Sequence, residues 1–175
     1  MTAQTGPGRS TIALGAWKWL ALSVTVVVVD QYSKYLIMQN LLEFERLVLL
    51  PVLELMRLHN DGAAFSLLSG AGGWQRWMFI GIGLAIGTGI LVWLLRLPAK
   101  GQGLLAAGLA LVLGGAIGNV TDRILWGHVV DFIRVHYQDW YFPAFNAADS
   151  AISIGVGLLL LDSLLDWRRS RKPAP

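Results

Sequence analysis

Four long runs of apolar residues alternate with more polar segments along this chain. A hydrocarbon core about 30 Å thick needs about 20 helical residues to cross it. The apolar runs cover residues 17–37, 77–95, 104–120 and 147–165, and charges lie near their ends. The pattern therefore predicts a mainly α-helical membrane protein with four transmembrane helices, formed by a single domain over residues 1–175.

The two longer connections, residues 40–75 and 124–146, have the pattern of surface structure rather than of linkers. Residues 43–59 are rich in Leu and Val and end in the turn signal Asn60-Asp61-Gly62, while residues 129–135 are β-prone. We expect a small extracytoplasmic β-sheet, a cradle on the membrane surface, with a short surface helix between residues 64 and 76. Residues 1–15 and 168–175 are expected to be flexible tails.

Charge distribution predicts the orientation in the membrane. Eight basic residues flank the helices on the side of the termini and of the short connection near Lys100, whereas six lie on the other side beside nine acidic residues. Since basic loops stay in the cytoplasm, both termini should be cytoplasmic. No cleavage site follows the first apolar run, so we interpret it as an uncleaved anchor. The net charge of +3 is not gathered in one patch, which argues against a nucleic-acid partner.

Polar residues gather where the predicted helices reach the outer boundary. A charge at membrane depth costs about 2.5 to 3.5 kcal/mol, so such residues usually have a partner and a function. The group comprises Asp30, Lys34, Asn60, Asn119, Asp122, Arg123, Asp131, Asn146 and Asp149. One polar site at the outer boundary is the simplest interpretation.

Structural roles explain several of these residues individually. Asn146 and Asp149 have the spacing of a helix cap, and Asp30 and Lys34 have the i, i+4 spacing of a helical ion pair. Asn119 and Arg123 could end the third helix, with Asp122 or Asp131 pairing with the arginine. The three histidines lack a metal-ligand spacing, so we expect no metal.

Capping does not explain why two carboxylates converge with three asparagines and an arginine at one boundary. Two close aspartates share one proton, so one can deprotonate water while the other protonates a carbonyl. The chain has no Cys, which excludes a thiolate nucleophile. Asp122 has a cation beside it in Arg123 and should stay ionised. Asp131 and Asp149 are therefore the predicted dyad of an aspartyl hydrolase.

Four blocks of the sequence resemble the bacterial lipoprotein signal peptidases, the type II signal peptidases of the inner membrane. The blocks are Asp30-Gln31-Tyr32-Ser33-Lys34, Asn60-Asp61-Gly62-Ala63-Ala64-Phe65-Ser66, residues 118–132 with Gly118-Asn119 and Val130-Asp131-Phe132, and Phe145-Asn146-Ala147-Ala148-Asp149-Ser150. Their order and spacing fit the four-helix plan, so the resemblance covers nearly the whole chain.

The resemblance implies an aspartyl endopeptidase that removes the signal peptide of diacylglyceryl-modified prolipoproteins before the lipidated cysteine. It implies that Asp131 and Asp149 are catalytic and that other polar positions support the dyad or the substrate. These supporting positions are Asp30, Lys34, Asn60, Gly62, Asn119, Asp122, Arg123 and Asn146. It also implies membrane lipids and globomycin-type inhibitors as ligands, a lid over residues 64–76 and no cofactor; we expect a monomer.

The main alternative from another class is a small proton-coupled transporter or channel, because paired acids in a membrane also form proton relays. That function would place acids near the midplane and would need repeats or broken helices. The acids of this chain lie at one boundary, and the second and third runs carry no charge. A structural membrane protein, the third alternative, should tolerate Asp131→Asn and Asp149→Asn.

Overall fold

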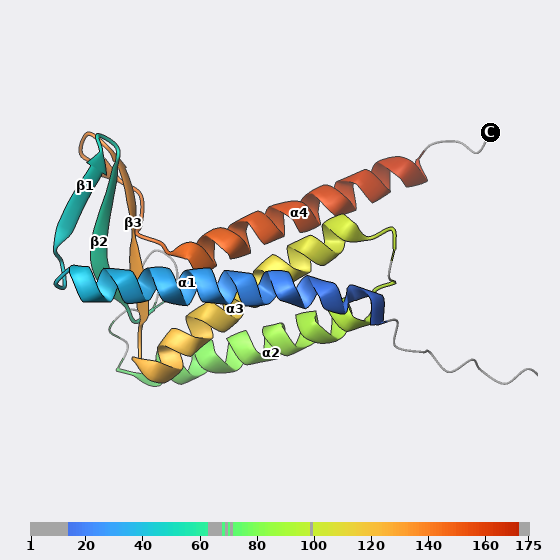
Figure 1. Ribbon diagram of the computed structural model, residues 1–175, viewed down its shortest axis with the longest axis horizontal. Helices are drawn as coiled ribbons and strands as arrows, with labels where there is room; N and C mark the ends of the chain where they lie inside the picture. The colour runs from blue at the N-terminus through green and yellow to red at the C-terminus, as the bar shows by residue number, and fades with distance from the viewer. Residues whose placement is uncertain (1–13, 63–67, 69, 71, 99, 172–175) are drawn as a thin grey trace, which may run out of the picture.

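Long helices form a bundle with a small sheet across one end (Figure 1). The computed structural model describes residues 14–62, 68, 70, 72–98 and 100–171. Within these ranges, four α-helices are long and apolar enough to cross a membrane. They are α1 (Leu20–Asn40), which follows the 3-10 helix η1 (Leu14–Trp19), α2 (Trp74–Arg96), α3 (Gly103–Leu125) and α4 (Ala147–Ser170). The predicted four-helix membrane fold is confirmed.

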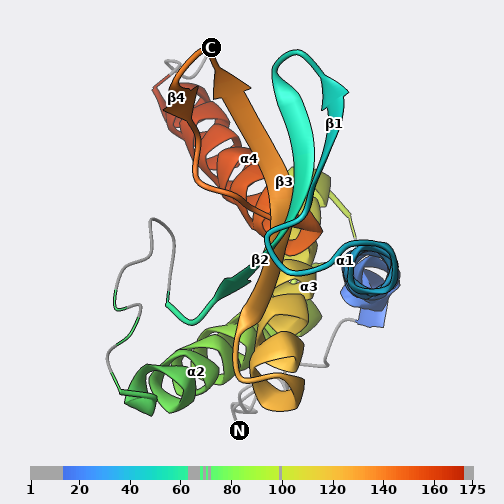
Figure 2. The ribbon, with the colours of Figure 1, turned by 90° about the vertical axis from the view of Figure 1, so that its left-hand side faces the viewer.

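The sheet lies at the end of the bundle where α1 ends and α4 begins (Figures 1 and 2). In the described part of the chain it has four antiparallel strands in the order β1-β2-β3-β4. The strands are β1 (Arg46–Leu50), β2 (Leu53–Asn60), β3 (Val129–Tyr137) and β4 (Trp140–Tyr141). This confirms the predicted small sheet and brings the two outer connections together, since β2 comes from the first and β3 from the second.

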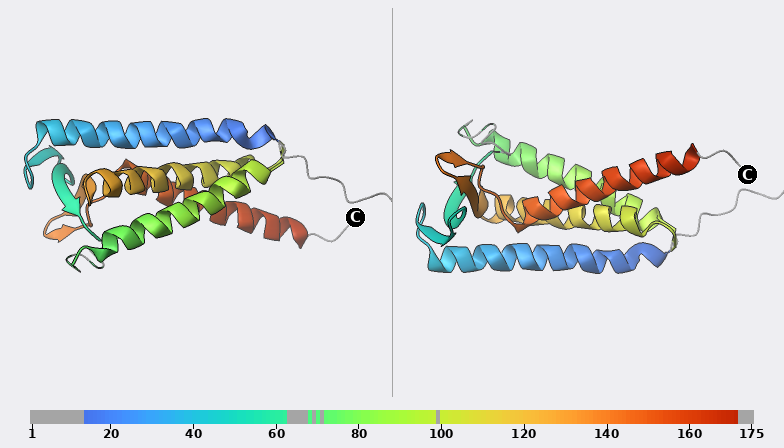
Figure 3. Two further views of the ribbon diagram at one scale, coloured as in Figure 1. Left: turned by 90° about the horizontal axis from the view of Figure 1, so that it is seen from below. Right: turned by 90° about the horizontal axis from the view of Figure 1, so that it is seen from above.

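Helix α3 lies at the centre of the bundle, with α1, α2 and α4 around it (Figure 3). Half of its apolar window is buried, against about a fifth for the other three helices. Glycines allow close packing here: a Cβ on Gly114 would come within 2.7 Å of the Ser23 carbonyl oxygen, and one on Gly118 within 2.6 Å of Asp30 Oδ2. Gly108 and Gly155 likewise bring the α3 and α4 backbones together. The other helices present exposed Val, Leu, Ile and Trp side chains outward, as a lipid-facing surface requires.

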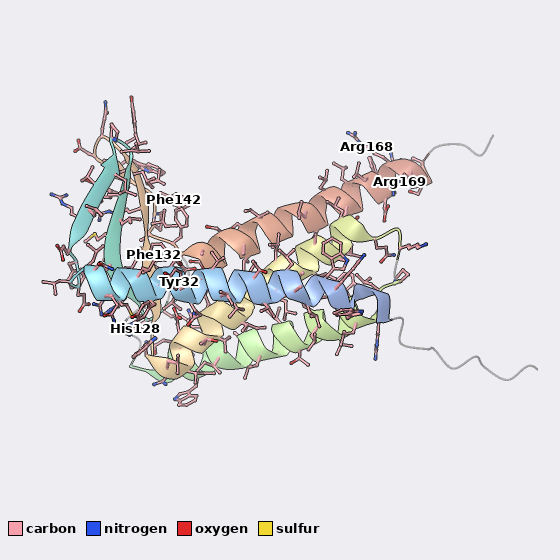
Figure 4. The ribbon with its side chains drawn as sticks, in the orientation of Figure 1. Tyr32, His128, Phe132, Phe142, Arg168 and Arg169 are labelled. Carbon is pink, nitrogen blue, oxygen red and sulfur yellow. The ribbon has the colours of Figure 1, made fainter. Side chains whose placement is uncertain are left out.

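Helix boundaries differ from the apolar runs at several ends. Helix α2 begins at Trp74, three residues before the predicted start. Helix α3 continues to Leu125, and Asp122 and Arg123 in its last turns are buried with partners from α1 and from the segment after β2. Helix α4 continues to Ser170, so the predicted tail begins too early. Its last turn carries Arg168 and Arg169, which suit the negative end of a helix dipole (Figure 4).

The predicted surface helix between residues 64 and 76 lies largely outside the described residues. The described part includes residues 74–76, which form the first turn of α2. Of the predicted flexible tails, residues 14 and 15 belong to η1, and residues 1–13 and 172–175 lie outside the described ranges.

Candidate active site

Strand β3 carries Asp131 into the site because side chains alternate along a strand. Its neighbours Val130 and Phe132 point to the other face, where they pack with Ile37 of α1. The strand pairing sets Asn60, the last residue of β2, opposite Val129. From there the Asn60 side-chain amide donates to Asp131 Oδ2 at 2.9 Å. Burial of the two apolar neighbours thus orients the carboxylate toward Asn60.

The first turn of α4 supplies the second carboxylate. Asn146 is the N-cap: its Oδ1 accepts the backbone N–H of Asp149 at 2.9 Å, and Asp149 Oδ2 accepts the backbone N–H of Asn146 at 3.3 Å. This reciprocal capping box satisfies two amides that a helix start leaves unpaired. The predicted capping role of Asn146 and Asp149 is therefore confirmed, and the capping box also restrains the Asp149 side chain.

Three asparagine side chains hold the two carboxylates through amide N–H groups. Asn146 Nδ2 donates to Asp131 Oδ1 and Asn119 Nδ2 donates to Asp149 Oδ1, each at 2.8 Å. Backbone N–H groups occupy the Oδ1 atoms of Asn60 and Asn146, with Gly62 N–H donating to Asn60 at 3.0 Å. Because the oxygen of each amide is already an acceptor, its NH₂ group faces the aspartate. Backbone N–H groups thus fix which end of Asn60 and Asn146 meets the acids.

A buried ion cluster lies beside these residues and joins α1 to α3. Lys34 Nζ lies 2.8 Å from Asp30 Oδ2 and 2.7 Å from Asp122 Oδ2, and all three residues are no more than 1% exposed. Gln31 Nε2 bridges the two aspartates at 3.1 and 2.8 Å. Asp122 therefore has a cation, as predicted, but the cation is Lys34 and not the adjacent Arg123.

The ion cluster extends into the site by two routes. Lys34 Nζ donates to Asn119 Oδ1 at 3.3 Å, which leaves the amide of Asn119 to donate to Asp149. Asp30 Oδ1 accepts the backbone N–H of Ala148 in the first turn of α4 at 2.9 Å. Buried charges on α1 thereby position a residue of α3 and the start of α4.

Arg123 joins the segment after β2 to α3. Its Nη2 donates to the Gly62 carbonyl at 2.7 Å and its Nη1 to the Asn119 carbonyl at 3.3 Å. The guanidinium also lies 5.0 Å from the centre of the Phe79 ring on α2. Arg123 forms no ion pair with an aspartate among the described residues, so the salt bridge considered from the sequence is absent there.

Asp131 and Asp149 line a cavity of about 570 Å³ between the sheet and α4. Asn60, Asn119 and Arg123 line it as well, whereas Asp30, Lys34 and Asp122 do not. The rest of the lining is largely apolar and includes Phe142, Phe145, Ile152 and Ile154. Figure 4 shows Phe142 beside β3 near the start of α4. The cavity combines two acids with an apolar lining, as binding sites in enzymes commonly do.

Electrostatics distinguish Asp131 from an ordinary surface carboxylate. Burial, reinforced by the negative charge of nearby Asp149, raises the pKa of Asp131 to about 6. Hydrogen bonds from Asn60 and Asn146 oppose this shift, because they stabilise the ionised form. Two acids in one cavity, one of which holds its proton unusually well, suit the sharing of a single proton.

All the residues predicted for the site come together at this end of the bundle, in two layers. Asp131, Asp149 and two of their amide donors, Asn60 and Asn119, line the cavity, and the Asp30–Lys34–Asp122 cluster does not. Gln31 and Ala148 were assigned no role from the sequence, although both lie within the blocks that carry the family resemblance. The sequence placed Phe142 at the interface and Phe145 near Asp149, but it did not predict that both line one cavity, because this depends on how β4 and α4 are oriented.

Comparison with known proteins gives one consistent result. The family model for signal peptidase (SPase) II matches residues 22–165. A lipoprotein signal peptidase of Pseudomonas aeruginosa is 51% identical over 150 residues, covering 85% of this chain and 88% of the relative. One of Pseudoalteromonas atlantica is 47% identical over 145 residues, covering 83% and 88% of the two chains.

Solved structures agree with the sequence relatives. A bacterial membrane enzyme determined by the in meso method superimposes with a TM-score of 0.79 at 31% identity, over 91% of this chain and 94% of that one. A second such enzyme gives a TM-score of 0.72 at 32% identity, over 85% and 93%.

Proposed function

The chain belongs to the signal peptidase II family, and we propose that Asp131 and Asp149 are the aspartic dyad with which it cleaves lipid-modified prolipoproteins. Membership makes it a protease and a multi-pass protein of a bacterial membrane. The aspartic mechanism is the proposal. The observation that carries it is that Asp131 and Asp149 both line the cavity, while Asp122 is paired with buried Lys34.

The hydrogen bonds around the dyad leave both acids able to take part in the reaction in different roles. Each carboxylate oxygen of Asp131 and Asp149 already accepts one N–H group, so each acid is held in place. A carboxylate oxygen has two acceptor positions, and the second is available to a water or a substrate carbonyl. One acid takes a proton from the attacking water as the other, protonated, donates to the scissile carbonyl.

The supporting residues have distinct tasks in this proposal. Asn60, Asn119 and Asn146 keep the dyad oriented with amide N–H groups directed at it. Arg123 and Gly62 hold the segment after β2 against α3, and Asp30, Lys34 and Asp122 restrain Asn119 and the start of α4. These residues act through the dyad and are therefore positioning residues.

The cavity also supports a lipid-modified substrate. Its apolar wall and the exposed aromatic residues Trp140 and Tyr141 of β4 suit a cysteine held at the interface by acyl chains. Each buried methylene group contributes about 0.8 kcal/mol, so two chains would hold the scissile bond at this depth. Globomycin-type inhibitors are expected to occupy the same cavity, with the protein acting as a monomer.

The proposed orientation places the sheet and the cavity on the outer side and both termini in the cytoplasm. Basic residues lie at the end of the bundle opposite the sheet, in accordance with the positive-inside rule, among them Lys18, Arg96, Arg168 and Arg169. No observation favours a transporter or channel, since the family is a peptidase family and the acids lie at one end of the bundle.

The dyad is tested with Asp131→Asn and Asp149→Asn. Purified full-length protein is incubated with a diacylglyceryl prolipoprotein, and signal-peptide release is followed by mass shift. Both variants should fall to background, and the double variant should be no worse than either single one, because the two acids act as a unit. Binding of the lipidated substrate or of globomycin should survive.

The matched control is Asp139→Asn, since Asp139 is an exposed acid on the turn between β3 and β4. It should cleave as the unaltered protein does. A folded Asp122→Asn variant that is inactive while Asp131→Asn retains turnover would assign the dyad to other residues. A precursor without the diacylglyceryl group should be cleaved far more slowly.

A further inference from the structure

A second cavity, also of about 570 Å³, lies at the sheet end of the bundle away from the dyad. The start of α2, the end of α3 and the turn before β3 form it, and Figure 2 shows these segments side by side. None of its described lining residues lines the active-site cavity.

The backbone of this cavity favours an anion. The 23-residue helix α2 begins here after Gly73, and its first turn has no side-chain cap. Its first N–H groups are therefore unpaired within the helix and carry the positive end of the helix dipole. Such helix starts bind phosphate groups readily.

Gln75 adds a side-chain donor to these amides. The residue is only 4% exposed and lines the cavity. Its Oε1 accepts the backbone N–H of Gly73 at 2.8 Å, so its Nε2 end is directed elsewhere. Among the described residues this Nε2 has no hydrogen-bond partner. Because Gln75 lines the cavity, this amide N–H group is available to an acceptor that enters it.

Arg76 supplies the positive charge of the cavity. Its Nη2 donates to the Ile124 carbonyl at 3.0 Å, and its Nε is buried without a partner in the described part of the chain. A guanidinium has five N–H groups, so most of its donors are unused here. His128, which Figure 4 labels, also lines the cavity. Burial, together with the neighbouring His59, whose ring stacks 3.9 Å away, lowers the pKa of His128. Arg76 is therefore the cation of the described lining at neutral pH.

The remaining lining residues include interfacial aromatic side chains and a carboxylate. Trp77 and Trp126 are 66% and 53% exposed and lie at the membrane-boundary ends of α2 and α3, as interfacial aromatic residues do. Asp61 contributes a carboxylate to the same cavity. A cation and an anion in one interfacial cavity complement a zwitterion, which has a phosphate and an ammonium group.

We propose that this cavity binds the headgroup of a zwitterionic phospholipid of the outer leaflet, with its phosphate at Arg76, Gln75 and the start of α2 and its primary ammonium group at Asp61. Phosphatidylethanolamine has this chemistry. Phosphatidylglycerol lacks the ammonium, and the quaternary ammonium of phosphatidylcholine cannot donate a hydrogen bond. The site is independent of the proposed dyad.

Lipid binding to delipidated full-length protein tests the proposal, with native mass spectrometry and titration of short-chain lipids as readouts. Phosphatidylethanolamine should bind about tenfold more tightly than the other two lipids, as one charged hydrogen bond requires. Arg76→Met should weaken it about tenfold, and Asp61→Asn should abolish the preference over phosphatidylglycerol. Arg46→Met, which removes an exposed arginine of β1 on the same side, is the matched control and should change nothing.

Arg76 also contacts the end of α3, so Gln75→Met provides a second variant in case Arg76→Met unfolds. Equal affinity for the three lipids, or unchanged binding in folded Gln75→Met or Arg76→Met, would overturn the proposal. Displacement of the lipid by excess inorganic phosphate would assign the site to free phosphate and contradict the lipid. Retention of the lipid under excess phosphate supports it.

Discussion

Replacing Lys34 with Met tests how far the buried ion cluster supports the fold. Lys34 is 1% exposed, and its Nζ lies within 2.8 Å of one oxygen of Asp30 and one of Asp122. Methionine has nearly the same length and can fill the same space, so packing changes little. The substitution removes the cation and leaves two buried carboxylates without their shared partner.

The structure sets the size of the effect. Removing one member of a buried ion pair costs about 3 to 5 kcal/mol, because the remaining charge stays desolvated. Asp30 retains the Ala148 N–H and Asp122 the Val130 N–H, at 2.9 and 3.2 Å, which keeps the cost within this range. For a chain of this size, each kcal/mol lowers the melting temperature by roughly 2 to 4 °C, so a fall of roughly 6 to 20 °C is expected.

Thermal unfolding of the detergent-purified protein measures this fall. The exposed Lys100→Met is the matched control and should melt as the unaltered protein does. Neutralising the cluster in Asp30→Asn/Lys34→Met/Asp122→Asn should recover much of the loss, because no unpaired charge remains. A Lys34→Met melting temperature within about 2 °C of the control would refute the argument that this cluster carries a paired charge essential to the fold.

Two further predictions concern pH and topology. Asp131 has a pKa of about 6 in the folded protein against an ordinary value of 3.8, so the folded state binds this proton more tightly than the unfolded state does. This contribution to the free energy of unfolding is present at low pH and is lost as pH rises from about 4 through 6. The melting temperature of Asp131→Asn should therefore rise relative to the unaltered protein over this window, and a constant difference would contradict the raised pKa. For topology, reporters fused at Gly101 and after the last residue should read cytoplasmic and one at Gly70 should read outside; an external reading at the C-terminus would reverse the proposed orientation.

The sequence was sufficient to predict the four helices, the small sheet and the gathering of the polar residues at one end of the bundle, but not the contacts of Gln31 and Ala148. A helix that crosses lipid must be apolar over about 20 residues, so composition along the chain reveals it directly. Asn146 and Asp149 were predictable as a cap because the capping box is a contact between residues three apart. The same local reasoning predicted the pair of Asp30 and Lys34, which lie one helical turn apart.

Only the tertiary structure decided which partners these residues take across elements. Sequence spacing suggested Arg123 as the cation for Asp122, but the packing of α1 against α3 brings Lys34 there instead, across 88 positions of the chain. Which carboxylate each of the three asparagine amides meets likewise depends on contacts between β2, β3, α3 and the start of α4. Local rules describe residues within one element, whereas these hydrogen bonds form between elements whose distance and rotation are set by the packing of the whole bundle. The apolar runs therefore determined that this chain forms a four-helix membrane protein, and the close approach of α3 to α1 and α4 at its glycines determined which acids meet a cation and which face the cavity.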